Sequence, residues 1–174
     1  MPATEPRQLW GGRFARLPDP SLLQLTTSIE EDMRLLEFDL QATRAHARVL
    51  AAAGLLHDDA LGQIDETCES LLDRWRRGEL STESHEDVHS LVEHHLTDTL
   101  GDIGRQIHAG RSRNDLVATD LRLWARSQVF EILDQLGALI TELAARAEEH
   151  ASTLMPSYTH LQRAQPVSLG FHLA

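Results

Sequence analysis

The chain has 174 residues, a length typical of one domain and sufficient to bury a hydrophobic core without a disulfide or a structural metal. Its formal net charge of −11 argues against a general nucleic-acid or anionic-membrane binder, because either would need a positive surface. The single cysteine, Cys68, excludes an intrachain disulfide and a zinc site made of several cysteines, and it fits a reducing, cytoplasmic setting.

The composition predicts an all-α protein. Aromatic residues make up only 5% of the chain, while Leu and Ala are abundant, which is the balance of a helix-rich soluble protein. No stretch resembles a signal peptide or approaches the ~18 to 20 apolar residues of a membrane span. We therefore expect a soluble protein that binds no membrane.

Residues 1–27 are expected to form an irregular arm. Up to Ser21 the chain carries four of its six prolines and the Gly11-Gly12 pair, and these residue types interrupt regular structure. Such an arm is ordered only where it docks on another surface.

Residues 28–112 are expected to form an N-terminal helical domain. Ser28 and Glu31 have the spacing of a capping box, and apolar residues then recur in steps of three and four as far as Gly54. This pattern predicts one long helix with a narrow apolar seam.

Two further helices complete this predicted domain. A second seam begins at Asp58 and ends at Gly78, so the first two helices should pack as a hairpin. A third helix is expected to open at Ser84 or Asp87 and to end before Gly101, after which the periodicity disappears.

Residues 113–174 are expected to begin a central helical-bundle domain. From about Asn114 to His150 there is no proline, and apolar residues again recur in steps of three and four. A helix of this length would run to roughly 55 Å, so its seam must be covered by downstream helices or by other subunits. After Pro156 we expect an irregular polar loop as far as Pro166, and then the opening of another helix.

The segment ahead of this helix reads GRSRND. Ser112, Arg113 and Asn114 are concentrated where the helix begins, and the free N–H groups and the positive end of the helix dipole point the same way. The combination can form a carboxylate-binding site. Taken alone, however, the segment favours an ordinary turn with Asn114 as N-cap and solvated arginines.

The second candidate segment contains Thr159, His160 and Gln162. A loop histidine with a pKa near neutrality can transfer protons or hold a carboxylate. The chain has ten histidines, so the alternative is a surface histidine without a special role.

His85 to His89 match the zinc motif H-E-x-x-H, in which two histidines one helical turn apart bind the metal. We expect no metal here, because His85 lies at the frayed start of the predicted helix and no third ligand is apparent. The simpler interpretation is that one histidine packs or caps while the other faces water.

These signals occur in one order that resembles the argininosuccinate lyases, a family of the fumarase and aspartase superfamily to which the eye-lens delta crystallins are related. The motifs WGGRF, HAGRSRND and YTHLQRAQP favour this family over fumarase or adenylosuccinate lyase. The matching segments are LWGGRF (9–14), TSIEEDMRLLEFD (27–39), AHARVLAAAGLL (45–56), EDVHSLVE (86–93), GRSRNDLVATDLRL (110–123) and YTHLQRAQPVSLGFHLA (158–174).

The resemblance implies a reaction and an assembly. The reaction is the reversible elimination of argininosuccinate to L-arginine and fumarate, the last step of arginine biosynthesis, without a metal or organic cofactor. The assembly is a homotetramer in which the middle domains form the central bundle and each active site draws segments from three subunits.

The resemblance also implies roles for single residues. The histidine that matches His160 is the one long assigned to acid-base catalysis. Residues matching Asp87, His89 and Gln162 are expected to support the site. Substrate binding is expected from the residues that match Ser28, Ser112, Arg113, Asn114 and Thr159.

The family's signature loop, with its presumed catalytic serine, is expected beyond Ala174, so this chain alone should lack activity. Two alternatives stay open. One is another lyase of the superfamily, such as adenylosuccinate lyase, and the other is a crystallin-like structural or interaction fragment whose site residues are unused.

Overall fold

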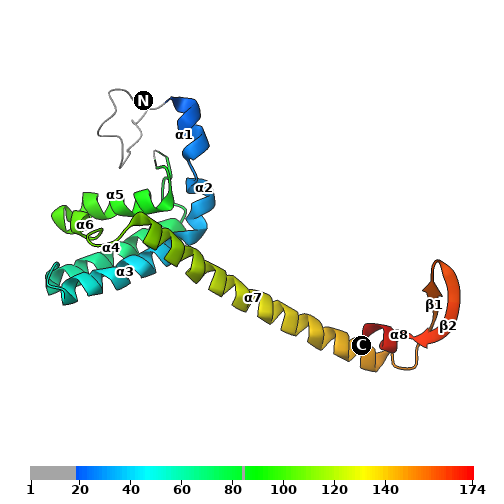
Figure 1. Cartoon of the computed structure of the whole chain (residues 1–174). Coiled ribbons are helices and arrows are strands. Elements are labelled where there is room, and N and C mark those ends of the chain that lie inside the picture. Colours follow the sequence, from blue (N-terminus) through cyan, green and yellow to red (C-terminus); the bar gives the residue numbers. More distant parts are fainter. Residues whose placement is uncertain (1–18, 84) are drawn as a thin grey trace. The chain divides into compact units, whose positions relative to one another are not determined.

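The computed structural model describes residues 19–83 and 85–174. The chain divides into two compact units, Met1–Trp124 and Ala125–Ala174, whose helices and strands are labelled in Figure 1. Most of the expected irregular arm lies outside the described residues. The domain boundary expected between residues 112 and 113 stays a prediction.

The last part of the expected arm is helical. Helix α1 spans Pro20–Thr26, within the segment for which we predicted irregular structure. The Asp19 carboxylate accepts a hydrogen bond from the backbone N–H of Ser21 at 2.9 Å. Pro20 lies in the first turn, where backbone N–H groups have no intrahelical acceptor, so the N–H that proline lacks costs no hydrogen bond. This proline therefore starts a helix instead of interrupting one.

The long helix expected from Ser28 is divided. Helix α2 (Ile29–Asp32), the 3-10 turn η1 (Met33–Leu35) and helix α3 (Leu36–Ala52) follow one another. The expected capping box is not formed. The Ser28 hydroxyl instead donates to the Asp32 carboxylate at 2.5 Å, and no backbone N–H is capped by the Ser28 side chain.

Helix α4 (Asp58–Arg76) packs against α3 as the expected hairpin. Outside the core, Arg44 binds Asp65 at 2.6 Å and Glu69 at 3.2 Å. Cys68 is only 1% exposed in the apolar seam, and burial raises the pKa of its thiol to about 12. The cysteine is therefore a core residue and not a nucleophile at neutral pH.

Helix α5 (Val88–Leu100) begins directly after Asp87, one of the two predicted starts, while the other, Ser84, lies outside the described residues. The Asp87 carboxylate accepts from the Ser90 N–H at 2.7 Å, and the Ser90 hydroxyl accepts from the Asp87 N–H at 3.2 Å. These two bonds form a capping box. After Gly101 the short helix α6 (Asp102–Gln106) packs back on α5, in a segment where the sequence shows no periodicity.

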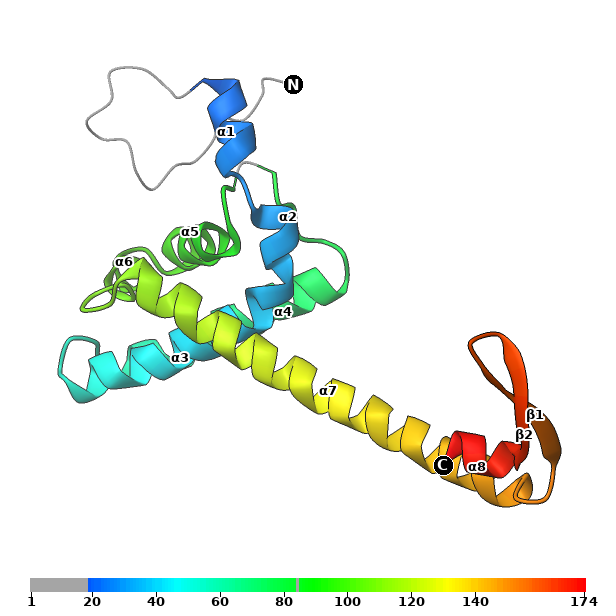
Figure 2. The ribbon, with the colours of Figure 1, turned by 45° about the vertical axis from the view of Figure 1, so that its right-hand side comes forward.

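Helix α5 packs on both α3 and α4, and these three helices enclose the core of the first unit (Figures 1 and 2). Most core residues lie in the predicted seams, and Ile29, Leu35, Leu56, Ala60 and Ile107 complete the core from outside them. Trp75 on α4 is 36% exposed and lies outside the core. The largest fully buried apolar side chains are Leu36, Ile64, Leu71, Val88, Leu91 and Leu96.

Helix α7 (Arg113–Glu149) has 37 residues and confirms the predicted rod. Its buried residues are Leu116 and Asp120. Along the predicted seam, Leu133 is 55% exposed and Ile140 is 65% exposed. The expectation that other helices cover this seam stays a prediction.

The second unit contains a β-hairpin where we predicted an irregular loop. Strand β1 (Leu154–Thr159) pairs antiparallel with β2 (Gln162–Ser168). Pro156 and Pro166 face each other in this ladder. Both strands of a two-stranded ribbon are edge strands, in which a proline can direct its missing donor position toward solvent. The loop prediction was wrong because the prolines indicated a break.

Helix α8 (Leu169–Leu173) follows β2 and confirms the helix expected at this end of the sequence. The N–H of Gly170 donates to the His150 carbonyl at 2.9 Å. A Cβ at Gly170 would lie 2.3 Å from the carbonyl oxygen of Ala147, so the close contact with the end of α7 requires glycine.

The described residues form helices and one hairpin, so the predicted all-α class is confirmed. Within residues 19–83 and 85–174, no helix combines the length and the apolar character needed to cross a bilayer.

Gly104→Ala is expected to destabilise the first unit. A Cβ at Gly104 would lie 2.4 Å from the carbonyl oxygen of Leu96 and 2.6 Å from Cα of Thr97, so α6 would have to move away from α5. We expect the free energy of unfolding, measured with urea on the purified chain, to fall by about 1–3 kcal/mol.

Gly62→Ala on α4 is the matched control, because nothing lies within 4 Å of the added Cβ. Alanine should stabilise this helix by up to ~1 kcal/mol. Equal stability of the two variants would contradict the close contact between α5 and α6.

Candidate functional site

The start of α7 presents polar side chains at a helix N-terminus. The Ser112 hydroxyl accepts from the Asn114 N–H at 3.2 Å, and the Asp115 carboxylate accepts from the Ser112 N–H at 3.0 Å. Ser112 therefore occupies the capping position, and the alternative with Asn114 as N-cap is wrong. The Ser112 and Asn114 side chains are exposed, beside the positive end of the helix dipole.

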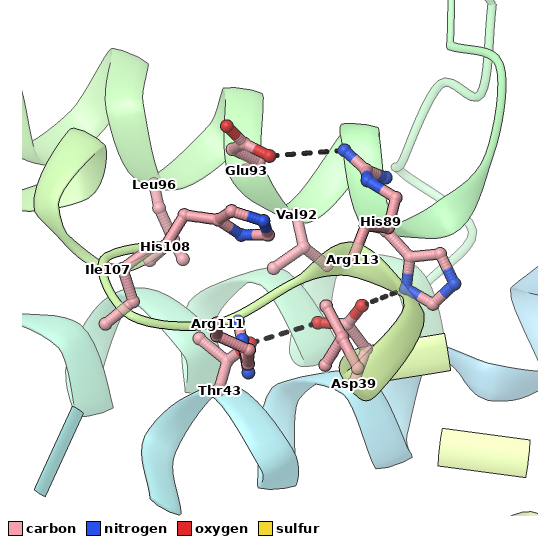
Figure 3. Close-up of a pocket in the computed structure, with 11 residues that line it drawn as sticks. Asp39, Thr43, His89, Val92, Glu93, Leu96, Ile107, His108, Arg111 and Arg113 are labelled. Atoms are coloured by element: carbon pink, nitrogen blue, oxygen red, sulfur yellow. Dashed lines mark hydrogen bonds and ion pairs between the residues drawn. The ribbon is translucent and has the colours of Figure 1, made fainter. Parts of the chain in front are cut away.

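Arg113 ties the start of α7 to α5. Its Nη1 donates to both carboxylate oxygens of Asp87, at 2.9 and 3.2 Å, and its Nη2 donates to Glu93 at 3.2 Å. Figure 3 shows the contact with Glu93. The arginine side chain is 29% exposed, so these ion pairs are partly shielded from water. The guanidinium is held between two carboxylates and is not a solvated charge.

Ser28 reaches the same region through the backbone. Its N–H donates to the carbonyl of Glu86 at 2.8 Å, directly before Asp87 in the chain. Ser28 at the start of α2 binds Glu86, and Arg113 at the start of α7 binds Asp87, the next residue after Glu86 and the cap of α5. These contacts therefore join the starts of the three helices. The first unit brings together five of the predicted site residues, Ser28, Asp87, Ser112, Arg113 and Asn114.

His89, a sixth predicted site residue, joins three helices in the interior. Its Nδ1 donates to Asp39 on α3 at 2.6 Å and lies 3.5 Å from a carboxylate oxygen of Asp120 on α7. The second oxygen of Asp39 accepts from the Thr43 hydroxyl at 3.2 Å (Figure 3). The side chains of Asp39 and Asp120 are 0% exposed and that of His89 is 4% exposed. We refer to Asp39, His89 and Asp120 as the buried triad.

The environment shifts the pKa values of His89 and Asp120. Burial lowers the pKa of His89, but the hydrogen bond to Asp39 and the surrounding carboxylate charges outweigh it, so the pKa is raised. Burial and the charge of Asp39 raise the pKa of Asp120 to about 7, against the lowering effect of the neighbouring cations. Asp120 therefore changes its protonation state near neutral pH.

The buried triad also approaches the geometry of a metal site. Its three candidate ligand atoms lie within 4.8 Å of one another. However, Nδ1 of His89 lies 2.6 Å from Asp39, within hydrogen-bond distance, so the imidazole and this carboxylate are partners without an ion between them. We therefore interpret the triad as an ion cluster and assign no metal to it.

A small cavity of about 10 Å³ lies beside the triad, with Arg111 and His108 in its wall (Figure 3). Its volume is that of about one water molecule, so the cavity alone cannot hold a substrate. The Nε of Arg111 is buried without a hydrogen-bond partner in the described part of the chain. Burial lowers the pKa of this guanidinium, while the charges of Asp39 and Asp120 favour its charged form.

Arg111 is a counter-charge to the buried triad that the sequence did not reveal. In the GRSRND motif nothing distinguishes it from Arg113, which lies two residues later. The difference between the two arginines arises only when α3, α5 and α7 pack together.

A second cavity, of about 150 Å³, lies among α4, α5 and the segment before α5, with His85 and His94 in its wall. The Nδ1 atoms of His85 and His94 are 3.3 Å apart. His85 precedes α5 and His89 faces Asp39, so the two histidines of the H-E-x-x-H motif do not face a common point. His89 packs as expected, but His85 contacts His94 instead of facing only water.

In the second unit, Thr159, His160 and Gln162 lie at the tip of the hairpin and are exposed. Thr159 and Gln162 are partners across the turn. His160 and Leu161 have φ values of 47° and 62°, as a two-residue hairpin turn of this hand requires. Positive φ is costly for residues other than glycine and clusters at functional sites. The tip therefore presents a hydroxyl, an imidazole and an amide together.

Comparison with known proteins gives a family. Residues 12–174 match the family described as Lyase. The chain is 46% identical over 166 residues to the argininosuccinate lyase of Thermoanaerobacter sp. (strain X514), covering 95% of this chain and 37% of that protein. It is 45% identical over 165 residues to the argininosuccinate lyase of Neisseria meningitidis (strain FAM18), covering 94% of this chain and 36% of that protein. The chain thus spans about a third of the length of these relatives.

The fold agrees with this family. EDDS lyase in complex with formate has a TM-score of 0.67 and 26% identity, covering 82% of this chain and 28% of that one. An EDDS lyase variant with bound fumarate has a TM-score of 0.68, covering 91% and 32%, and at 23% identity this likeness shows the fold alone. With a family match over nearly its whole length and a fold that agrees, the chain belongs to the lyase family and is similar to its argininosuccinate lyases.

Proposed function

We propose that this chain is the N-terminal part of an argininosuccinate lyase, which eliminates argininosuccinate reversibly to L-arginine and fumarate in the last step of arginine biosynthesis. The contacts that link Ser28 through Glu86 and Asp87 to Arg113, which lies between Ser112 and Asn114 at the start of α7, carry this proposal. The 46% identity to an argininosuccinate lyase supports it. We also propose a cytoplasmic location, with which the reduced, buried Cys68 agrees.

The proposed chemistry needs donors for a carboxylate. Elimination removes a weakly acidic proton next to a carboxylate of the succinate moiety, so negative charge builds up on that group. Fixed hydrogen-bond donors that face it stabilise the transition state more than the ground state. Ser112 and Asn114 are exposed donors at the positive end of α7, and Arg113 adds a charge that Asp87 and Glu93 hold in place. Ser28 and Thr159 are the further binding residues in this proposal.

His160 is the proposed proton-transfer residue. An acid must protonate the departing guanidine nitrogen, and a protonated imidazole can do so. With Gln162 as a supporting contact, the hairpin tip would act on the leaving group. We assign the general base to the family's signature loop, which is not among the motifs of this chain, and the reaction needs no metal or organic cofactor.

We propose that the complete protein is a homotetramer with active sites shared between subunits. The exposed apolar seam of α7 supports this assembly, because Leu133, Leu136 and Ile140 are between 47% and 65% exposed. The chain alone is proposed to be inactive, since it spans only 37% of its Thermoanaerobacter relative.

A chimera tests the proposed reaction. We expect this chain, joined to the remaining C-terminal part of the Thermoanaerobacter lyase, to release fumarate from argininosuccinate, because 95% of the chain aligns with that relative. Fumarate is followed by its ultraviolet absorbance, with the intact Thermoanaerobacter enzyme as the positive control. The chain by itself should release none. A correctly folded, tetrameric chimera that releases no fumarate would contradict the proposed reaction.

In the active chimera, His160→Asn is expected to lower kcat by about 10²- to 10⁴-fold while KM changes less. Asparagine tolerates positive φ, so the turn is kept while the imidazole is lost. His172→Asn on α8 is the matched control, because His172 is also exposed in the second unit. Equal turnover in His160→Asn and the parent would remove His160 from the mechanism.

A further inference from the structure

Two carboxylates that the proposed reaction does not use lie behind His89. Asp39 and Asp120 are both 0% exposed, and burying a carboxylate costs free energy unless bonds or charges compensate. Asp39 is compensated by His89 and Thr43. Both oxygens of Asp120 are buried without a hydrogen-bond partner among the described residues. The burial of Asp120 is therefore not explained by a gain in stability. This indicates a role other than stabilising the fold.

Asp120 makes a second contact between α7 and α5, deeper in the interior than the contact that Arg113 makes. It lies about two helical turns after Arg113 on α7. Arg113 binds Asp87 at the start of α5, and Asp120 faces His89, two residues further along α5. Two electrostatic contacts thus join the same stretches of α5 and α7. Together these two contacts fix how the first turns of α7 are rotated about the helix axis and where they lie along α5.

We propose that Asp39 and Asp120 are positioning residues that hold the first turn of α7, and with it the donors of residues 112–114, in the orientation that binds the substrate carboxylate. Neither acid touches the substrate. Asp39 fixes the His89 ring on α5, and Asp120 connects that ring to α7. The inference deepens the proposed function and rests on it.

The link from Asp120 to His89 depends on charge. His89 is faced by Asp39 from α3, Asp87 from the start of α5 and Asp120 from α7, and Arg111 acts on both carboxylates of the triad. Asp120 attracts the imidazolium only when it is ionised. Because burial raises its pKa to about 7, the link weakens as the pH falls through about 7, and substrate binding should weaken with it.

The same shift acts on stability in the opposite direction. A carboxyl whose pKa is higher in the folded state favours folding at low pH, and this contribution is lost as the pH rises through the folded-state value of about 7. Above that pH, the ionised Asp120 strengthens the contact with His89 while costing the fold stability. A merely structural acid would change substrate binding and stability in the same direction.

Asp120→Asn in the active chimera tests this inference, since asparagine keeps the size and removes the charge. At about pH 8 we expect KM for argininosuccinate to rise about 5- to 20-fold, kcat to change less than about twofold, and the melting temperature to stay equal or rise. The parent's increase of KM below about pH 7 should disappear in the variant. Asp39→Asn should also raise KM. Asp134→Asn, at an exposed position on α7, is the control and should change nothing.

A lower melting temperature together with an unchanged pH dependence of KM would overturn the positioning role. An inactive parent chimera would count against the proposed function, and the link would then be decided on the chain alone by NMR titration of the His89 ring. The charge of Asp120 raises the His89 pKa, so Asp120→Asn should lower it. An unchanged His89 pKa overturns the inference whatever the chimera does.

Discussion

The ionic contacts between α5 and the first turns of α7 connect the fold to the proposed site. Helix α7 fully buries only Leu116 and Asp120 and packs the partly buried Trp124 against the core, and a buried leucine contributes only about 1.5–3 kcal/mol and little direction. The orientation of α7 depends instead on the ion pairs of Arg113 with Asp87 and Glu93. The contact between His89 and Asp120 adds to them. The hydrogen bonds of Arg113 to Asp87 and Glu93 fix distance and angle better than apolar contacts do, so the placement of the exposed donors at the helix start depends on them.

The buried triad and Arg111 place charged groups in the interior, where well-packed apolar side chains would give a more stable fold. Replacing buried ion clusters by well-packed apolar residues is often neutral or stabilising, so the triad and Arg111 are poorly explained by stability alone. Arg111 reduces the cost, because its charge favours the ionised form of Asp120, while its own Nε lacks a hydrogen-bond partner in the described part of the chain. A cluster of this kind is expected where orientation matters more than stability.

The sequence predicted the elements that local patterns determine. Apolar periodicity located α3, α4, α5 and α7 and most of the core, and Asp87 was recognised as a possible helix start. The hairpin was missed because a two-residue turn usually contains glycine or asparagine, whereas here His160 and Leu161 adopt positive φ. Residue types singled out Ser112, Arg113, Asn114, Thr159, His160 and Gln162, whereas Ser28, Asp87 and His89 came from the resemblance. The links among Ser28, Asp87 and Arg113 were visible only in the fold. The buried triad had no local signal, because Asp39 and His89 lie 50 residues apart.

A helix N-terminus in open water binds a carboxylate weakly, because solvent competes for the ligand and screens the dipole. Ser112 and Asn114 are exposed in this chain, and so are Thr159 and His160 at the hairpin tip. The donors therefore become effective only when other surfaces exclude water from them. The uncovered seam of α7 provides a driving force for such closure, since burying Leu133, Leu136 and Ile140 against further helices would release free energy. In the proposed assembly, formation of the bundle and completion of the proposed site are one event, and the proposed role of the ionic contacts at the start of α7 is to keep the donors oriented until it occurs.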